Sequence, residues 1–309
     1  MSEAGKKVIV FGPAGVGKTS TVLTSFFGYP FEAVEKLQPT KGISIESVKF
    51  RGLVKISVWD CAGQEKYMSS HFSDLGRMRI FSEIDVAVFV MDASRDDTLD
   101  AKFVDKFMEV VLDFNPDIEK VYIFINKMDI APSDINDKVM KLTNDIISKW
   151  KNGIVEIINC SVKLGTTRRQ FIQVLDSILR KDKELVEKQK FFSECLLDFE
   201  DVVKGKFVLF HTPSMLMTAS TYSPEDVSWI GEEEFIVNEK IDIRKANESM
   251  VEDIFIQKNT DETLILMRVN ALSSLLVIIN EEVQDPVDIA NKLMNHDTFR
   301  DLDQILYAR

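Results

Sequence analysis

The sequence predicts an α/β fold with a doubly wound, mainly parallel sheet, followed by a smaller α+β region. Between residues 7 and 180, short apolar strands alternate with amphipathic helices, and a glycine-rich turn joins the first strand to the first helix. After residue 200 the expected strands follow one another in runs of two and three with helices before, between and after them, which is the order of an α+β region. A chain of 309 residues is long enough for two domains, expected at 1–182 and 183–309.

The glycine-rich turn lies between the apolar strand Lys7–Phe11 and a helix expected over Thr19–Phe27. Glycine adopts backbone conformations closed to other residues, so successive N–H groups can point inward and bind an anion at the positive end of the helix. Lys18 adds a positive charge for the β and γ phosphates, and the Thr19 hydroxyl suits Mg²⁺. This pattern is a P-loop, and the residues expected to bind phosphate are Gly12, Pro13, Ala14, Gly15, Val16, Gly17, Lys18, Thr19 and Ser20.

Past the first helix, residues 26–38 show no clear period, so we expect a loop there. Apolar and polar residues then alternate from Ile43 to Phe50 and from Val54 to Trp59, on either side of an Arg51–Gly52 turn. This alternation is typical of an antiparallel hairpin. Its second strand leads into Asp60–Gln64 at the carboxyl edge of the sheet, where ligands bind in open α/β sheets.

Side chains around this hairpin match the chemistry of a γ-phosphate. Asp60 is expected to hold Mg²⁺ through water, and Thr40, in the loop before the hairpin, to complete the metal shell. Gly63 lets a backbone N–H approach the γ-phosphate, and Gln64 can orient the attacking water. We therefore expect Lys18, Thr40 and Gln64 to act in catalysis, and Thr19, Thr40 and Asp60 to bind the metal.

Strands and helices continue to alternate along the rest of the first region. The expected strands lie at 86–91, 120–125 and 155–160, and the expected helices at 97–114 and 134–150. Apart from the hairpin, this order predicts parallel strands with helices on both faces.

The strand ending at residue 125 leads directly into Asn126-Lys127-Met128-Asp129. A carboxylate at Asp129 can accept two N–H bonds from the edge of guanine, and adenine lacks that pair of donors. The Lys127 stem can cover one face of the base, and Asn126 can tie this loop to the P-loop. After the last strand, backbone N–H groups of Ser161 and Val162 are candidates to bind the guanine carbonyl.

The last third of the chain contains candidate strands and helices but no catalytic cluster, since His211 and His296 are isolated. We expect a charged linker at 180–190, helices at 191–201, 243–251 and 286–305, strands at 207–210, 215–219, 253–257, 263–269 and 274–279, and an acidic loop at 223–234. Strands Leu264–Val269 and Leu275–Ile279 are almost continuously apolar, so both faces of their sheet need cover. Because we expect the helices of this region to shield only part of it, a second subunit is expected to supply the rest.

Composition limits the partners. A formal net charge of −12 argues against nucleic acid or an anionic membrane as a direct partner, because both repel a negative surface. With no run of about 18 apolar residues and with Ser2 where myristoylation needs glycine, we expect no direct membrane insertion. Three cysteines without metal-ligand spacing favour a reducing cytosol. If the protein works on a membrane, a partner has to hold it there.

The first region resembles a small GTPase of the Ras superfamily, and the stretches VWDCAGQEKYMSSHF (Val58–Phe72) and NKMD (Asn126–Asp129) are most similar to the Rag GTPases. The resemblance implies a switch that binds GTP and GDP with Mg²⁺ and hydrolyses GTP slowly. It also implies a roadblock or longin-like second domain that pairs with another Rag-like or roadblock subunit. GTPase-activating and exchange proteins are further expected partners.

Two other functions remain open from the sequence. One is an Arf-like membrane-traffic GTPase, because Pro39-Thr40-Lys41-Gly42 is reminiscent of Arf-like proteins. The other is a nucleotide-bound scaffold with negligible turnover, against which intact Thr19, Asp60 and Gln64 count.

Overall fold

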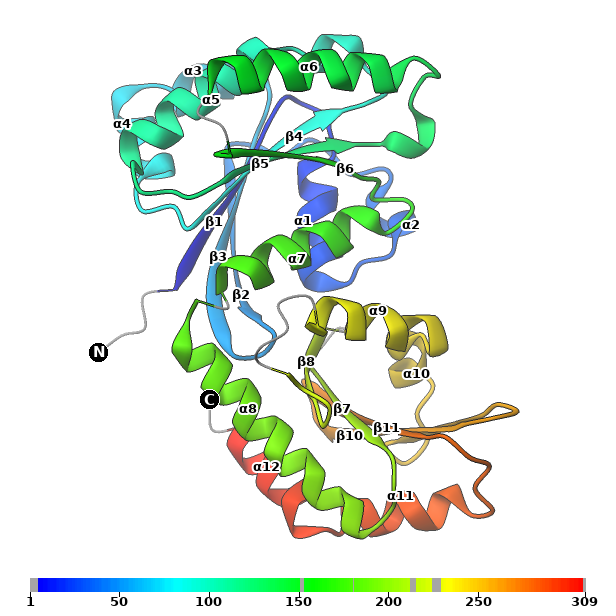
Figure 1. Cartoon of the computed structure of the whole chain (residues 1–309). Helices are drawn as coiled ribbons and strands as arrows, with labels where there is room; N and C mark the ends of the chain where they lie inside the picture. The colour runs from blue at the N-terminus through cyan, green and yellow to red at the C-terminus, as the bar shows by residue number, and fades with distance from the viewer. Residues whose placement is uncertain (1–4, 151–152, 180, 212–214, 224–228, 308–309) are drawn as a thin grey trace. The chain divides into compact units, whose positions relative to one another are not determined.

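The structure is a computed structural model, and it describes residues 5–150, 153–179, 181–211, 215–223 and 229–307 (Figure 1). The chain divides into two compact units. The first comprises residues 1–49 and 54–175, and the second comprises residues 50–53 and 176–309. None of the helices in the described ranges is long and apolar enough to cross a membrane.

The first unit is built on a six-stranded sheet with the order β2-β3-β1-β4-β5-β6. Strand β1 runs parallel to both β3 and β4, and β5 runs parallel to β4 and β6. Strands β4 and β5 are buried at every position, as their continuous apolar runs predict. The strands are β1 (Lys6–Phe11), β2 (Ile43–Phe50), β3 (Val54–Cys61), β4 (Val86–Asp92), β5 (Val121–Asn126) and β6 (Val155–Asn159).

Helices cover both faces of this sheet. On one face, Phe11 of β1 packs with Phe81 and Phe107 from two helices, at ring-centroid distances of 5.7 and 5.4 Å. On the other, Phe171 packs against Phe124 of β5 and against Phe26. The α-helices are α1 (Lys18–Phe27), α2 (Phe31–Val34), α3 (Glu65–His71), α4 (Asp74–Phe81), α5 (Ala101–Phe114), α6 (Ile135–Lys149) and α7 (Thr166–Leu179), with short 3-10 turns η1 (Asp96–Thr98) and η2 (Met128–Ile130).

This architecture confirms the predicted mixed α/β fold with a mainly parallel sheet. Two local differences stand out: the expected loop at 26–38 contains the short helix α2, and residues 65–81, to which no element was assigned, form α3 and α4. Because the β1–α1 turn lies between β3 on one side and β4 on the other, the glycine-rich segment sits where the strand order reverses.

The second unit contains a five-stranded antiparallel sheet with the order β8-β7-β11-β10-β9. Its strands are β7 (Lys206–His211), β8 (Met215–Ala219), β9 (Ile254–Lys258), β10 (Thr263–Asn270) and β11 (Ser273–Ile279). Its helices are α8 (Lys183–Leu197), α9 (Trp229–Lys240), α10 (Ile243–Glu248), α11 (Pro286–Met294) and α12 (Asp297–Tyr307), with a short 3-10 turn η3 (Asp198–Asp201). This α+β unit agrees with the predicted fold class.

The expectation that a second subunit has to cover this sheet is wrong. Residues of α8, η3, α11 and α12 form one core with alternate residues of the strands, and residues of α9 and α10 form another with the remaining alternate residues. Strand β11 is buried at all seven positions within the single chain. The helices therefore shield both faces without a partner.

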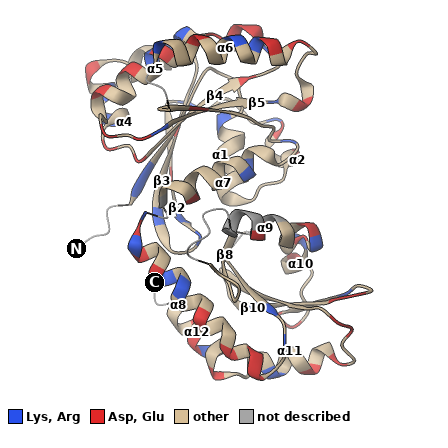
Figure 2. Cartoon of the chain, viewed as in Figure 1, with Lys and Arg blue, Asp and Glu red and all other residues tan. Residues whose placement is uncertain are grey.

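Other expectations for the tail also need correction. The charged stretch 180–190 is not a linker, because Asp182 caps α8 and the helix begins at Lys183. Figure 2 shows residues of both signs along α8, and Glu184 pairs with Lys188 one turn apart. The expected helix at 286–305 is divided into α11 and α12. Within the expected loop at 223–234, helix α9 begins at Trp229, while residues 224–228, like residues 212–214, lie outside the described residues.

The second unit also buries an ion-pair cluster around Arg51. The Arg51 side chain has no exposed surface, and its Nε and Nη2 donate to the two Asp176 carboxylate oxygens at 2.8 and 2.6 Å. Its Nη1 donates to Glu234 Oε2 at 3.0 Å and to the Leu216 carbonyl. Burial opposes the guanidinium charge, but the two carboxylates outweigh it and raise the pKa of Arg51.

Candidate functional site

The P-loop joins β1 to α1 in a conformation that requires glycine. Gly12 has a φ of 138°, and a Cβ there would lie 2.2 Å from the Val90 carbonyl oxygen. Gly17 has a φ of 97°, and a Cβ there would lie 2.5 Å from Asn126 Nδ2. Both values of φ are in the region that side chains rarely adopt. The loop is therefore held close to the ends of β4 and β5 at these two points.

Lys18 begins α1 and is almost fully buried. Its Nζ donates a hydrogen bond to the Pro13 carbonyl at 2.6 Å, which holds the ammonium group against the loop. Burial lowers the pKa of Lys18 to about 8, although the Asp60 carboxylate acts in the opposite direction. An ammonium group with this little solvation gains from an anion placed beside it.

The three residues expected to bind metal come together from three segments. Thr19 Oγ1 donates to Asp60 Oδ2 at 2.5 Å, and Thr40 Oγ1 lies 2.7 Å from Thr19 Oγ1 and donates to the same carboxylate oxygen at 3.1 Å. Asp60 is 2% exposed, and burial raises its pKa. Its other oxygen, Oδ1, is buried and makes no hydrogen bond. A hard-oxygen set with one buried carboxylate oxygen left over fits Mg²⁺.

Gly63 and Gln64 follow β3 and lie at the P-loop. A Cβ on Gly63 would lie 2.3 Å from the Gly12 carbonyl oxygen, so only glycine allows the two segments to approach this closely. Gln64 is extended and immediately precedes α3, where its side chain does not cap the helix. Both residues line the same cavity as Lys18 and Thr19.

Asn126 connects the end of β5 to the P-loop, as the sequence predicts. Its Nδ2 donates to the Val16 carbonyl at 3.0 Å, and its Oδ1 accepts from Val162 N–H and Thr167 Oγ1, both at 3.2 Å. The side chain is 1% exposed, and both its amide nitrogen and its amide oxygen make hydrogen bonds. Asn126 therefore fixes the end of β5 and the segment that follows β6 relative to the P-loop.

Lys127 and Asp129 extend the site beyond Asn126. Lys127 has a φ of 64°, and its Nζ donates to the Gly15 carbonyl at 2.8 Å. A non-glycine residue in this conformation carries strain that functional sites often retain. Asp129 accepts a hydrogen bond from Ser161 Oγ at 2.5 Å, which orients its carboxylate.

The N–H groups of Ser161 and Val162 have partners inside the protein. Ser161 N–H donates to Thr166 Oγ1 at 2.8 Å, and Val162 N–H donates to Asn126. In this structure the two residues orient Asp129 and Asn126, and their direct contact with a base stays a prediction.

These residues surround one cavity of about 550 Å³. The predicted site residues that line it are Ala14, Gly15, Gly17, Lys18, Thr19, Ser20, Thr40, Gly63, Gln64, Asn126, Lys127, Asp129 and Val162. Gly12, Pro13, Val16, Asp60 and Ser161 are not among the lining residues. Side chains from 31–38, including Phe31, Val34 and Leu37, add an apolar wall that the sequence did not assign to the site.

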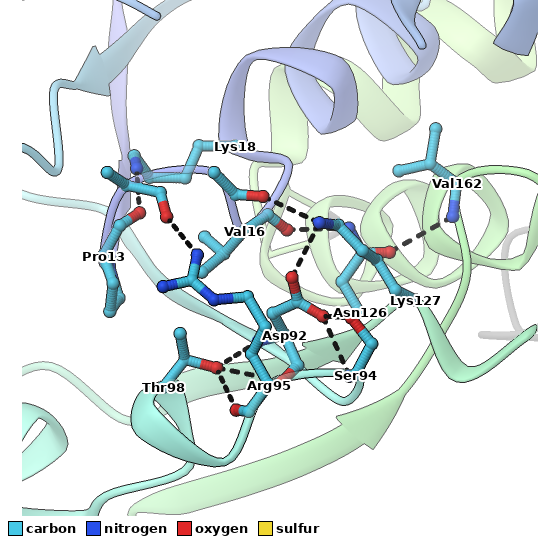
Figure 3. Close-up of polar contacts among 12 residues, drawn as sticks. Pro13, Val16, Lys18, Asp92, Ser94, Arg95, Thr98, Asn126, Lys127 and Val162 are labelled. Carbon is cyan, nitrogen blue, oxygen red and sulfur yellow. Dashed lines mark hydrogen bonds and ion pairs between the residues drawn. The ribbon is translucent and has the colours of Figure 1, made fainter. Parts of the chain in front are cut away.

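A group of polar residues at the end of β4 and just after it was also missed. Asp92 is fully buried, and its Oδ2 accepts from Lys127 Nζ at 2.6 Å while its Oδ1 accepts from Ser94 Oγ at 2.6 Å (Figure 3). Arg95 donates from Nη1 to the Ala14 carbonyl at 3.0 Å. A sequence signal could have found Asp92, because it ends a parallel strand and therefore lies at the ligand-binding edge beside Asn126.

Comparison with known proteins agrees with this geometry. The family model described as the Gtr1/RagA G protein conserved region matches residues 7–228. GTP-binding protein gtr1 of Schizosaccharomyces pombe is 31% identical over 137 residues, which cover 44% of each chain. Ras-related GTP-binding protein A of Dictyostelium discoideum is also 31% identical over 137 residues, covering 44% of this chain and 45% of its own.

A more distant similarity extends to ADP-ribosylation factor-like protein 3 of Caenorhabditis elegans, at 28% identity over 146 residues. These cover 45% of this chain and 69% of that protein. The chain thus spans less than half the length of the two GTP-binding relatives that it matches at 31% identity.

Proposed function

Because the chain belongs to the Gtr1/RagA G protein family, we propose that it binds GTP and GDP together with Mg²⁺, hydrolyses GTP slowly and acts as a switch. One observation carries this proposal. A single cavity has the P-loop residues Lys18 and Thr19 on one side and Asp129 on the other, and Asn126 ties the two sides together. A guanine nucleotide has an anionic end and a base with two adjacent donors, which suits both sides.

Each side chain has a defined task in this proposal. Lys18 places a buried positive charge beside the terminal phosphates, and phosphate charge compensates the cost of its burial. Thr19, Thr40 and Asp60 hold the metal, which when bound neutralises charge on the phosphate oxygens. Gln64 orients the attacking water in the cavity.

The switch follows from where these groups sit in the chain. Thr40 belongs to the segment before β2, and Gln64 precedes the short helix α3. Both lie in connecting segments, which are less firmly held than the sheet, so contacts to the γ-phosphate can order them and hydrolysis can release them. Activating and exchange proteins would act on these two segments.

The base assignment is tested by Asp129→Asn. The amide cannot accept both guanine donors, so affinity for GDP should fall by about a hundredfold or more, while affinity for xanthosine diphosphate should rise. Isothermal titration calorimetry measures both affinities. Asp134→Asn is the matched control, because Asp134 is exposed and pairs with Lys138 on a solvent face. Unchanged GDP affinity in Asp129→Asn contradicts the proposed base site.

We further propose that residues 183–309 form a roadblock or longin-like assembly domain that pairs with another Rag-like or roadblock subunit in the cytoplasm. Support comes from exposed apolar side chains in this unit, such as Val251, Leu272 and Val287. Light scattering of the full-length chain in GDP and in GTP, alone and with candidate subunits, tests this. A strictly monomeric chain under all of these conditions refutes it.

A further inference from the structure

Three successive carbonyls of the P-loop are bound by side chains from outside the loop. Ala14 O accepts from Arg95, Gly15 O from Lys127, and Val16 O from Asn126, at 3.0, 2.8 and 3.0 Å. In a planar trans peptide the C=O and the following N–H point in opposite directions. Holding these oxygens fixes the N–H groups of Gly15, Val16 and Gly17 on the opposite side of the loop.

Two of these three donors belong to the base-binding motif, but Arg95 does not. It follows β4 and is held in place on both sides. Its Nε and Nη2 form a paired contact with the Asp97 carboxylate at 3.1 and 2.7 Å. Its carbonyl accepts from Thr98 Oγ1 at 2.9 Å, and Thr98 is itself 1% exposed. Arg95 is therefore oriented before any ligand binds, and Figure 3 shows its contacts with the P-loop and with Thr98.

We propose that Arg95 is a positioning residue of the phosphate site, which holds the Ala14–Gly15 peptide so that the Gly15 N–H is presented to phosphate. This inference rests on the proposed nucleotide binding. Arg95 acts through the P-loop backbone, because its guanidinium group is engaged by Ala14 and Asp97 and Arg95 does not line the cavity. A preorganised N–H does not have to be reoriented when the anion arrives, so it binds more strongly.

The test compares release of a fluorescent GDP analogue from full-length variants in the presence of Mg²⁺. Arg95→Ala should release GDP about five- to tenfold faster, because one charge-assisted hydrogen bond to the loop is lost. Arg95→Lys keeps a positive donor but loses the paired contact with Asp97, so its rate should lie in between. Lys138→Gln is the matched control, since Lys138 pairs with the neighbouring Asp96 and with Asp134 on an exposed face. Its rate should stay within about twofold of the unsubstituted protein.

A second measurement distinguishes a role of Arg95 in positioning phosphate from a general loosening of the nucleotide site. The ratio of affinities for GDP and inosine diphosphate depends on the base contacts, so Arg95→Ala should leave it unchanged. Three outcomes would each overturn the inference. The first is a GDP release rate in Arg95→Ala within about twofold of the unsubstituted protein. The others are a changed ratio of the GDP and inosine diphosphate affinities, or an equally fast release in Lys138→Gln. Failure of the unsubstituted protein to bind GDP refutes the proposed function instead.

Discussion

The buried Arg51 cluster gives a prediction about stability that can be worked from its contacts. Arg51→Met keeps an unbranched apolar stem but removes four donated hydrogen bonds, two of them to Asp176. Removing one member of a buried ion pair costs about 3–5 kcal/mol, because the other charge stays in a poorly solvating environment. Asp176 and Glu234 also have other interactions, so we expect the lower end, about 3 kcal/mol.

Hydrogen exchange followed by mass spectrometry can measure this loss within the second unit. Amides of β11 lie in the middle of its sheet, between β7 and β10, and report opening of that unit. A loss of about 3 kcal/mol should accelerate their exchange by about 150-fold where exchange occurs through opening of the unit. The same substitution at Arg300, which is exposed and pairs weakly with Asp297 at 3.5 Å, should change stability by no more than about 0.5 kcal/mol. Equal effects of the two substitutions would refute the stabilising role of the cluster.

Two further predictions concern the nucleotide site. No arginine lies between Thr19 and Thr40 to stabilise the charge of the transition state, so single-turnover GTP hydrolysis should be on the order of 10⁻³ s⁻¹ or slower. Gln64→Leu should slow hydrolysis further. A hydrolysis rate above about 10⁻¹ s⁻¹ would contradict this prediction. Because burial lowers the pKa of Lys18 to about 8 in the free protein, phosphate binding above that pH has to take up a proton. Affinity for GDP should therefore fall about fourfold from pH 7 to pH 8.5, whereas a flat profile in calorimetry would show that Lys18 stays charged.

The lowered pKa of Lys18 also predicts how the stability of the nucleotide-free protein changes with pH. The folded-state pKa of Lys18 is below the unfolded value of 10.5, so the unfolded chain binds more protons between about pH 8 and 10.5. The Lys18 contribution to stability therefore increases with pH across this window. A bound nucleotide, which favours the charged form, should reduce this increase.

Contiguous motifs allowed most of the first unit to be predicted from sequence. Gly12–Thr19, Asp60–Gln64 and Asn126–Asp129 each begin at or just after the carboxyl end of a strand, and parallel strands bring these ends to one edge of the sheet. Local spacing and sheet geometry together were enough to place Thr19 near Asp60. Asp92 and Arg95 were missed because their contacts depend on how the β4 end packs beside the P-loop, and neither lies in a recognisable motif.

The second unit was predicted less well because its sequence signals have two meanings. A run of charged residues at 180–190 is compatible with a linker and also with a helix stabilised by ion pairs one turn apart. In the structure Asp182 caps a helix that begins at Lys183. Apolar strands show that both sheet faces are buried but not which elements bury them. The burial of Arg51 has no sequence signal, because an arginine in a hairpin turn is usually exposed.

Membership of residues 50–53 in the second unit affects how the protein can be dissected. A single cut near residue 182 leaves Arg51 and Asp176 together on the N-terminal fragment and puts Glu234 on the other fragment. In the C-terminal fragment the Glu234 carboxylate would lack its guanidinium partner. Limited proteolysis or expression of 183–309 alone therefore underestimates the stability of that unit. A fragment that keeps the whole cluster has to begin before Asp176 and has to be supplemented with the turn, for example as an added peptide that carries Phe50–Leu53.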